Sequence, residues 1–145
     1  MPRPGIHDIE SQLRLDEGEV LHAYQDQLGY WTIGIGRLID KRKSGGLTRA
    51  ESAFLLHNDI SKRMAAVREE LPWFDTLSPP RQGVLLNMAF QMGVEGLLGF
   101  KNTLRMIQEG RYSDAAAAML QSKWATQTPD RAKRLSAQMR LNEWQ

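Results

Sequence analysis

Three side chains suited to acid–base chemistry lie close together in the sequence: Glu17, Asp26 and Thr32. Glu17 is expected at the end of a short helix, where the helix dipole and any burial would both favour the protonated carboxyl that a general acid needs. Asp26 lies in a segment of turn composition and can stay ionised. Thr32 shares a strand face with Gly34, opposite the apolar residues, so a polymer could approach it closely. Two carboxylates in unlike environments suit glycoside hydrolysis, although each residue alone also fits a plain structural role.

Other catalytic chemistries find no support in the sequence. Cysteine is absent, which excludes disulfides, cysteine-bound zinc and thiol nucleophiles. The histidines His7, His22 and His57 lack metal-ligand spacing, and the chain has no P-loop and no G-x-S-x-G motif. Gly34-Ile35-Gly36 opens a dinucleotide fingerprint, but Ile39 stands where that pattern needs glycine. We therefore expect no metal and no cofactor.

Apolar periodicity predicts the elements that position the three residues. Apolar residues three and four apart predict a helix over 6–17, with Gly18 as its stop. Alternation over 30–36 predicts a strand paired with 23–25, so residues 21–40 are expected to form a small sheet of two or three strands. Such a sheet is marginal alone and must pack on a helix.

The rest of the chain is predicted to be helical. Capping-box spacing between Thr48 and Glu51, followed by apolar residues at helical steps, predicts a long helix over 49–70. Four further helices are expected: from Ser78-Pro79 to Gly93, from Leu104 to Gly110, from a cap at Ser113 to about Trp124, and from Thr128-Pro129 with Leu135 and Met139 inward. The predicted class is a helix-rich α+β protein.

Charge and length limit the possible partners. The chain has 145 residues and a net charge of +2. This length suits one domain, or two small lobes that share a core. Residues 1–98 carry 11 basic and 13 acidic side chains, whereas residues 99–145 carry 8 and 4. A basic C-terminal part suggests an anionic partner, although charge alone favours a solvated charged face. No segment reaches the apolar length of a membrane span, and the first residues do not form a secretory signal.

A family resemblance joins these observations. Several short motifs around the three residues closely resemble the phage-type lysozyme family (bacteriophage endolysins, muramidases), including its Glu, eight residues, Asp, five residues, Thr spacing. The resemblance runs in order from about residue 9 to 135. The residues that carry it are Glu17-Gly18, Tyr24, Asp26, Gly29-Tyr30, Thr32–Gly36, Asn87–Gly93, Phe100–Met106 and Trp124–Arg134.

The resemblance implies a two-lobed lysozyme fold and hydrolysis of peptidoglycan. Residues 1–145 would form one domain, with 18–48 as a small sheet lobe, 49–71 as a connecting helix, and 1–17 with 72–145 as a helical lobe. The bond cleaved would be the β-1,4 link between N-acetylmuramic acid and N-acetylglucosamine. Glu17 would protonate the leaving oxygen, while Asp26 and Thr32 would hold water on the opposite sugar face, which gives inversion.

The resemblance also implies substrate contacts and one departure from the family pattern. By family position, the substrate-binding residues along the cleft would be Leu38, Phe90, Gln91, Thr103, Lys123, Gln127 and Arg131. Arg37 replaces the histidine that is usual after Ile-Gly-Ile-Gly, and we expect it to pair with Asp59 on the long helix.

Two other functions compete with lysis. A catalytically inactive lysozyme fold could serve as a wall-binding module, although the intact catalytic spacing argues against it. A basic helical nucleic-acid binder would use Arg131, Lys133, Arg134 and Arg140, but no aromatic platform accompanies them. We therefore expect a monomer that acts on peptidoglycan, without nucleic acid or stable membrane association. We expect it to be made in the host cytoplasm without a signal peptide and to act on the wall after release.

Overall fold

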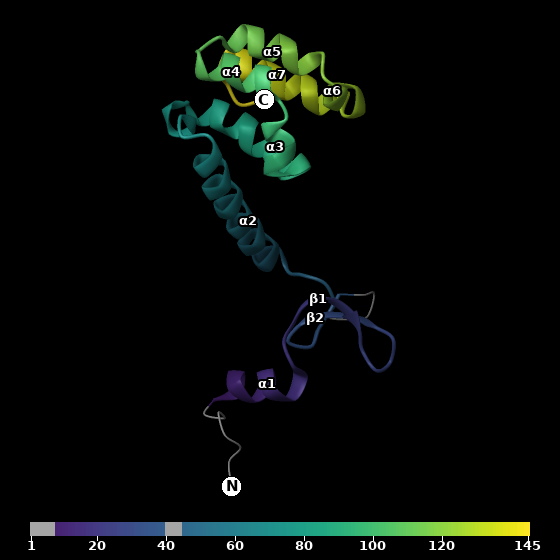
Figure 1. The fold of residues 1–145 in the computed structure, drawn as a ribbon. Coiled ribbons are helices and arrows are strands. Elements are labelled where there is room, and N and C mark those ends of the chain that lie inside the picture. The colour runs from purple at the N-terminus through teal and green to yellow at the C-terminus, as the bar shows by residue number, and fades with distance from the viewer. Residues whose placement is uncertain (1–7, 40–44) are drawn as a thin grey trace. The chain divides into compact units, whose positions relative to one another are not determined.

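The computed structural model describes residues 8–39 and 45–145, which form parts of two compact units. The units comprise residues 1–54 and 55–145, and each is described here by itself. Figure 1 shows their elements in chain order. His7, the first two residues of the predicted helix over 6–17 and the last residue of the predicted sheet segment lie outside the described residues.

The first unit opens with helix α1, Ile9–Glu17. Asp8 caps it, because the Asp8 carboxylate accepts a hydrogen bond from the Ser11 backbone N–H at 2.7 Å. The helix ends where Gly18 takes a positive φ of 75° and its N–H bonds the Arg14 carbonyl. The predicted stop at Gly18 is confirmed. No residue of α1 is buried, and Glu17 is exposed, so the burial considered for its carboxyl is not observed.

A three-stranded antiparallel sheet follows α1, in the order β1-β2-β3. The strands are β1 Val20–Gln25, β2 Trp31–Gly34 and β3 Arg37–Leu38. This confirms the predicted small sheet. The expectation of an open face at Thr32 is wrong, because only 3% of this residue is exposed. Thr32 lies on the central strand, where Tyr24 and Leu38 flank it from β1 and β3.

Helix α2, Arg49–Glu70, confirms the predicted long helix. Its capping box is formed: the Thr48 N–H donates to Glu51 Oε1 at 2.8 Å, and the Glu51 N–H donates to Thr48 Oγ1 at 3.2 Å. The two units divide within this helix, after Phe54. Near its C-terminal end Val67 is fully buried in the core of the second unit.

The second unit continues with helices only. They are the 3₁₀ turn η1 Phe74–Thr76, α3 Pro79–Leu98, α4 Lys101–Gln108, α5 Tyr112–Leu120, α6 Lys123–Gln127 and α7 Pro129–Leu141. The predicted end at Gly93 is a break instead, because helix resumes after its φ of 78° and ψ of 164°.

The boundaries predicted for the alanine-rich helix are wrong. Arg111, not Ser113, is the residue that precedes α5. The helix ends at Leu120, and Ser122 starts α6 by accepting a hydrogen bond from the Ala125 N–H at 3.2 Å. Trp124 therefore belongs to a separate short helix. Pro129 at the start of α7, with Leu135 and Met139 buried, is as predicted.

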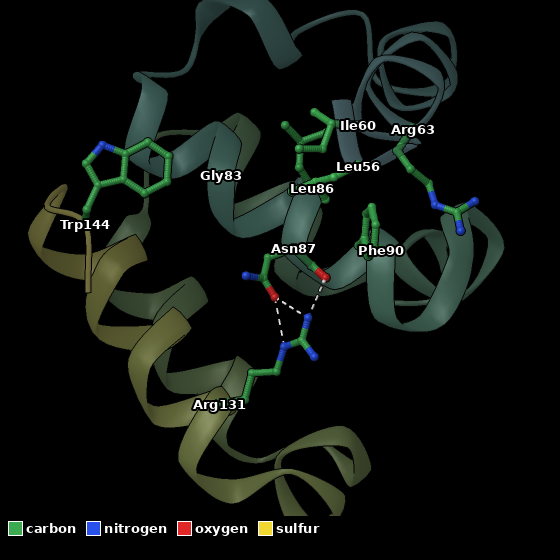
Figure 2. Close-up of a pocket in the computed structure, with 9 residues that line it drawn as sticks. All are labelled: Leu56, Ile60, Arg63, Gly83, Leu86, Asn87, Phe90, Arg131 and Trp144. Carbon is green, nitrogen blue, oxygen red and sulfur yellow. Dashed lines mark hydrogen bonds between the residues drawn. The ribbon is translucent and has the colours of Figure 1, made fainter. Parts of the chain in front are cut away.

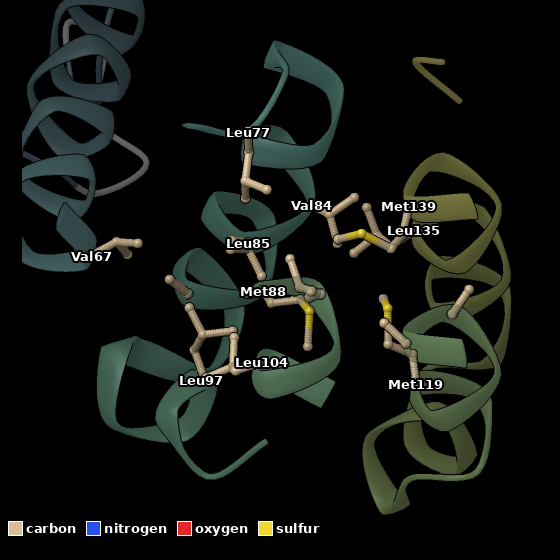
Figure 3. Packing of buried hydrophobic residues seen from close by; sticks show 14 of the residues in the cluster. Val67, Leu77, Val84, Leu85, Met88, Leu97, Leu104, Met119, Leu135 and Met139 are labelled. Atoms are coloured by element: carbon tan, nitrogen blue, oxygen red, sulfur yellow. The ribbon is translucent and has the colours of Figure 1, made fainter. Parts of the chain in front are cut away.

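The core of the second unit consists mostly of buried aliphatic and methionine side chains from its packed helices, together with Phe74 and Trp124 (Figure 3). Leu85 and Met88 of α3, Met119 of α5 and Met139 of α7 are all almost fully buried there. The buried Ser136 hydroxyl donates to the Ala116 carbonyl at 2.9 Å and so joins α7 to α5. Among the described residues, no single helix is long and apolar enough to cross a membrane, although α3 and α4, bent by 101°, pass that test together.

Candidate active site

The three predicted catalytic residues all belong to the first unit. Glu17 is the last residue of α1, and its side chain extends to the turn between β2 and β3. A Cβ atom placed on Gly36 would lie 2.8 Å from Glu17 Oε2. The carboxyl is therefore in close contact with the backbone at Gly36, and it remains exposed to solvent.

Asp26 is fixed by the turn that joins β1 to β2. Its Oδ1 accepts hydrogen bonds from the backbone N–H groups of Leu28 and Tyr30, both at 2.9 Å. Its backbone closes the same turn, since the Asp26 N–H donates to the Tyr30 carbonyl at 2.8 Å. Aspartate side chains commonly stabilise turns in this way. The arrangement holds a carboxylate at a defined place beside the strand that carries Thr32.

The main chain of Tyr30 connects Asp26 with Thr32. The Tyr30 N–H donates to the Asp26 carboxylate, and the Tyr30 carbonyl accepts a hydrogen bond from the Thr32 hydroxyl at 3.1 Å. Both side chains are thus tied to one peptide segment. Leu38, a predicted substrate-binding residue, is the half-buried β3 partner of Thr32.

The predicted pairing of Arg37 with Asp59 is wrong. Arg37 forms an ion pair with Glu51, with Nη2 at 2.6 Å from Glu51 Oε1, and its Nε donates to the Gly46 carbonyl at 3.1 Å. Asp59 lies eight residues further along α2, about 12 Å along a helix axis. The Thr48 N–H holds the pKa of Glu51 below its ordinary value, and Arg37 lowers it further.

The other predicted substrate-binding residues belong to the second unit, where Trp124 forms a hydrogen bond with one of them. Gln91 of α3 accepts a hydrogen bond from the Trp124 indole N–H at 2.9 Å. Trp124 also meets Phe100 edge-on, with ring centroids 6.0 Å apart. Lys123 and Gln127 are exposed at the two ends of α6, and only 6% of Thr103 on α4 is exposed.

Phe90 and Arg131 line a pocket of about 400 Å³ between α2, α3 and α7 (Figure 2). Arg131 donates to Asn87 Oδ1 from Nε at 2.8 Å and from Nη2 at 2.6 Å, which fixes the plane of its guanidinium. The Phe90 ring faces the Arg63 guanidinium, whose central carbon lies 5.7 Å from the ring centroid. The remaining lining is mostly apolar and comes from Leu56, Ile60, Gly83, Leu86 and Trp144.

Sequence reasoning missed Gly36, Asn87 and Trp144 as members of these surroundings. Asn87 is three residues before Phe90 on one helix, so its spacing could have placed it on the same helix face. Gly36 carried a motif signal but no sign of its contact with Glu17. Within the described residues, no group of three or more acidic or histidine side chains could hold a metal ion.

Comparison with known proteins decides the family. The sequence model described as phage lysozyme matches residues 15–140. The chain belongs to the phage lysozyme family. It is 34% identical to the Dictyostelium discoideum protein named "Probable T4-type lysozyme 1", over 90% of this chain and 92% of that protein. It is also 32% identical to the pre-baseplate central spike protein Gp5 of Enterobacteria phage T4, over 88% of this chain but 27% of that protein.

A third relative is the peptidoglycan hydrolase gp36 of Pseudomonas phage phiKMV, with 31% identity over 77% of this chain and 13% of that protein. The matched family range includes Glu17, Asp26, Thr32 and every predicted substrate-binding residue. The chain is thus a lysozyme-type glycoside hydrolase, and the predicted family, α+β lysozyme-like fold and enzyme class are confirmed.

Proposed function

We propose that this lysozyme hydrolyses the β-1,4 bond between N-acetylmuramic acid and N-acetylglucosamine in peptidoglycan, with inversion at the anomeric carbon. The observation that carries the proposal is the pair of carboxylates in unlike settings. Glu17 is exposed at a helix end against Gly36, and Asp26 is fixed by two backbone N–H groups. The name of the phiKMV relative, a peptidoglycan hydrolase, supports the same substrate.

In this mechanism Glu17 is the general acid. It donates its proton to the glycosidic oxygen while the bond from that oxygen to the anomeric carbon breaks. A water molecule attacks the anomeric carbon from the opposite face, and Asp26 accepts the proton that the water loses. Thr32 helps to hold this water. Both side chains are bonded to the main chain of Tyr30, the Asp26 carboxylate to its N–H and the Thr32 hydroxyl to its carbonyl.

Each unit contains predicted substrate-binding residues. Leu38 belongs to the first unit, and the exposed Lys123 and Gln127 belong to the second. Arg131, whose plane is fixed by Asn87, is suited to a peptide-stem carboxylate, and the Phe90 ring to the apolar face of a sugar. For Thr103 and Gln91, burial and the Trp124 hydrogen bond favour roles in shaping the site around the substrate.

The proposal extends to the domain organisation, the oligomeric state and the place of action. We propose one lysozyme domain over 1–145, with residues 18–48 as the sheet lobe, 49–71 as the connecting helix and the remaining residues as the helical lobe. We propose that it works as a monomer on the bacterial wall, after synthesis in the host cytoplasm, without cofactor, nucleic acid or stable membrane association. Sedimentation of the purified protein would test the monomer.

Analysis of the products tests the proposed bond and stereochemistry. Purified peptidoglycan is digested, and the new reducing ends are identified by mass spectrometry after borohydride reduction. Reduced N-acetylmuramic acid is the expected product, and reduced N-acetylglucosamine would contradict the proposed bond. Proton NMR of a soluble glycan substrate during early turnover should show the α-anomer first, and initial release of the β-anomer would contradict inversion.

A further inference from the structure

Gly36 lies in the turn between β2 and β3, directly against the carboxyl of Glu17. A Cβ atom on Gly36 would lie 2.8 Å from Glu17 Oε2, 3.1 Å from Cδ and 3.3 Å from Cγ. The carboxyl thus occupies the space that any other side chain at position 36 would need. We propose that Gly36 is a positioning residue for Glu17, because its missing side chain lets the carboxyl rest against this turn. The inference depends on the proposed role of Glu17 as the acid.

Backbone conformation alone does not explain why position 36 needs glycine. Gly34 and Gly36 have almost the same positive φ, 70° and 71°, in the region that glycine adopts most easily. A Cβ atom on Gly34, however, would meet nothing within 4 Å. The two glycines therefore share one backbone requirement, but only Gly36 has a side-chain neighbour. This difference supplies a matched control within the same motif.

A side chain at position 36 would move the carboxyl rather than the strand. The nearest atom, Glu17 Oε2, is at the free end of a flexible side chain, and Glu17 is exposed. The carboxyl can therefore swing away at little cost to the fold. A general acid must stay within hydrogen-bond reach of the leaving oxygen, so the same movement is costly for catalysis.

The turn is a suitable support because the residue after Gly36 is anchored. Arg37 pairs with Ile33 across the two strands and donates from Nε to the Gly46 carbonyl at 3.1 Å. Its guanidinium also bonds Glu51, at the start of α2. These contacts hold the backbone at position 36 in place, and the backbone in turn limits where the Glu17 carboxyl can lie.

The test compares Gly36→Ala with Gly34→Ala in the full chain. We expect both variants to lose similar stability in urea, because both force alanine into the same φ region. Only Gly36→Ala should lower kcat on soluble peptidoglycan strands, by about 100-fold for a displacement near 1 Å, with little change in KM. Only Gly36→Ala should also move the ¹³C resonance of the Glu17 carboxyl. Equal kcat losses, or an unmoved Glu17 resonance in Gly36→Ala, would overturn the inference.

Glu17→Asp and Glu17→Gln complete the experiment. Glu17→Asp withdraws the carboxyl from Gly36 without altering the turn, so it answers the question even if Gly36→Ala does not fold. We expect its kcat to fall by a factor comparable to that of Gly36→Ala, whereas parental kcat in Glu17→Asp would count against positioning. Glu17→Gln should be inactive. Full activity of Glu17→Gln would contradict the proposed function itself. If Glu17→Gln is inactive but Gly36→Ala is fully active, only the positioning role of Gly36 is contradicted.

Discussion

The contact between Gly83 and Trp144 can be tested by stability measurements. The effect of Gly83→Ala on the free energy of unfolding should have opposite signs in the parent and in Trp144→Ala. The Trp144 indole lies on Gly83 of α3, at the wall of the pocket in Figure 2. A Cβ atom on Gly83 would lie 2.5 Å from Trp144 Cζ3 and 2.6 Å from Cη2, so Gly83→Ala must displace the ring. In a helix without this neighbour, replacing glycine by alanine stabilises by about 1 kcal/mol.

The magnitude follows from how much of Trp144 is covered. Trp144 is 65% exposed, so about a third of its surface is buried. For a tryptophan this is roughly 90 Å² of mostly apolar area, worth up to about 2 kcal/mol at about 25 cal/mol per Å². Displacing the ring should therefore outweigh the gain in helix propensity. We expect Gly83→Ala to destabilise the parent by up to about 1 kcal/mol. In Trp144→Ala, where Gln138 Nε2 remains 3.1 Å from the added Cβ, the substitution should stabilise by up to about 1 kcal/mol.

A double-mutant cycle measures this coupling directly. The parent, the two single variants and the double variant are unfolded in urea and followed by far-UV circular dichroism, because fluorescence would change with the removal of Trp144. The expected coupling free energy is about 2 kcal/mol, well above the ~0.5 kcal/mol scatter of independent sites. Additive effects, or stabilisation by Gly83→Ala in the parent, would refute the packing argument.

Three further predictions concern other contacts. Thr48 and Arg37 keep the pKa of Glu51 low, so Glu51 stabilises the fold at pH values above the ordinary glutamate pKa, and this stabilisation is lost as the pH falls through the lowered pKa. The urea midpoints of the parent and Glu51→Gln should therefore differ at neutral pH and converge in acid. A difference that stays constant with pH would contradict this. Asp26→Asn keeps an acceptor oxygen for the turn, so this variant should fold like the parent but lose activity. Asp26→Ala should lose activity and also have a lower melting temperature. An active Asp26→Asn would exclude Asp26 as the base. Gln91→Leu removes the acceptor of the Trp124 indole and should cost about 0.5–1.5 kcal/mol in thermal unfolding, whereas a raised KM at unchanged stability would favour direct substrate contact.

Local signals in the sequence were strong enough to predict most elements. The capping box from Thr48 to Glu51 and the apolar periodicity after it predicted α2 over 49–70, as observed. Alternation over 30–36 predicted the central strand, and Gly18 predicted the end of α1. These features depend on residues a few positions apart, so the sequence alone can specify them.

The errors arose where non-local contacts decide the outcome. Alternation placed Thr32 on an open face, but its neighbours on both flanking strands bury it. Periodicity carried one helix through to Trp124, although the Ser122 cap starts a new one. Arg37 pairs with Glu51 because the capping box already places that carboxylate at the start of α2. The contact of Glu17 with Gly36 joins residues from different elements, which no spacing rule contains.

The most direct test of the central claim compares Glu17→Gln with Glu19→Gln. Both substitutions remove one carboxylate from an exposed position, only two residues apart. Loss of turbidity is measured on Gram-negative cell walls stripped of their outer membrane, after circular dichroism has shown that both variants are folded. We expect clearing by the parent and by Glu19→Gln, and none by Glu17→Gln. Clearing by Glu17→Gln at the parental rate would contradict the role of Glu17 as the acid.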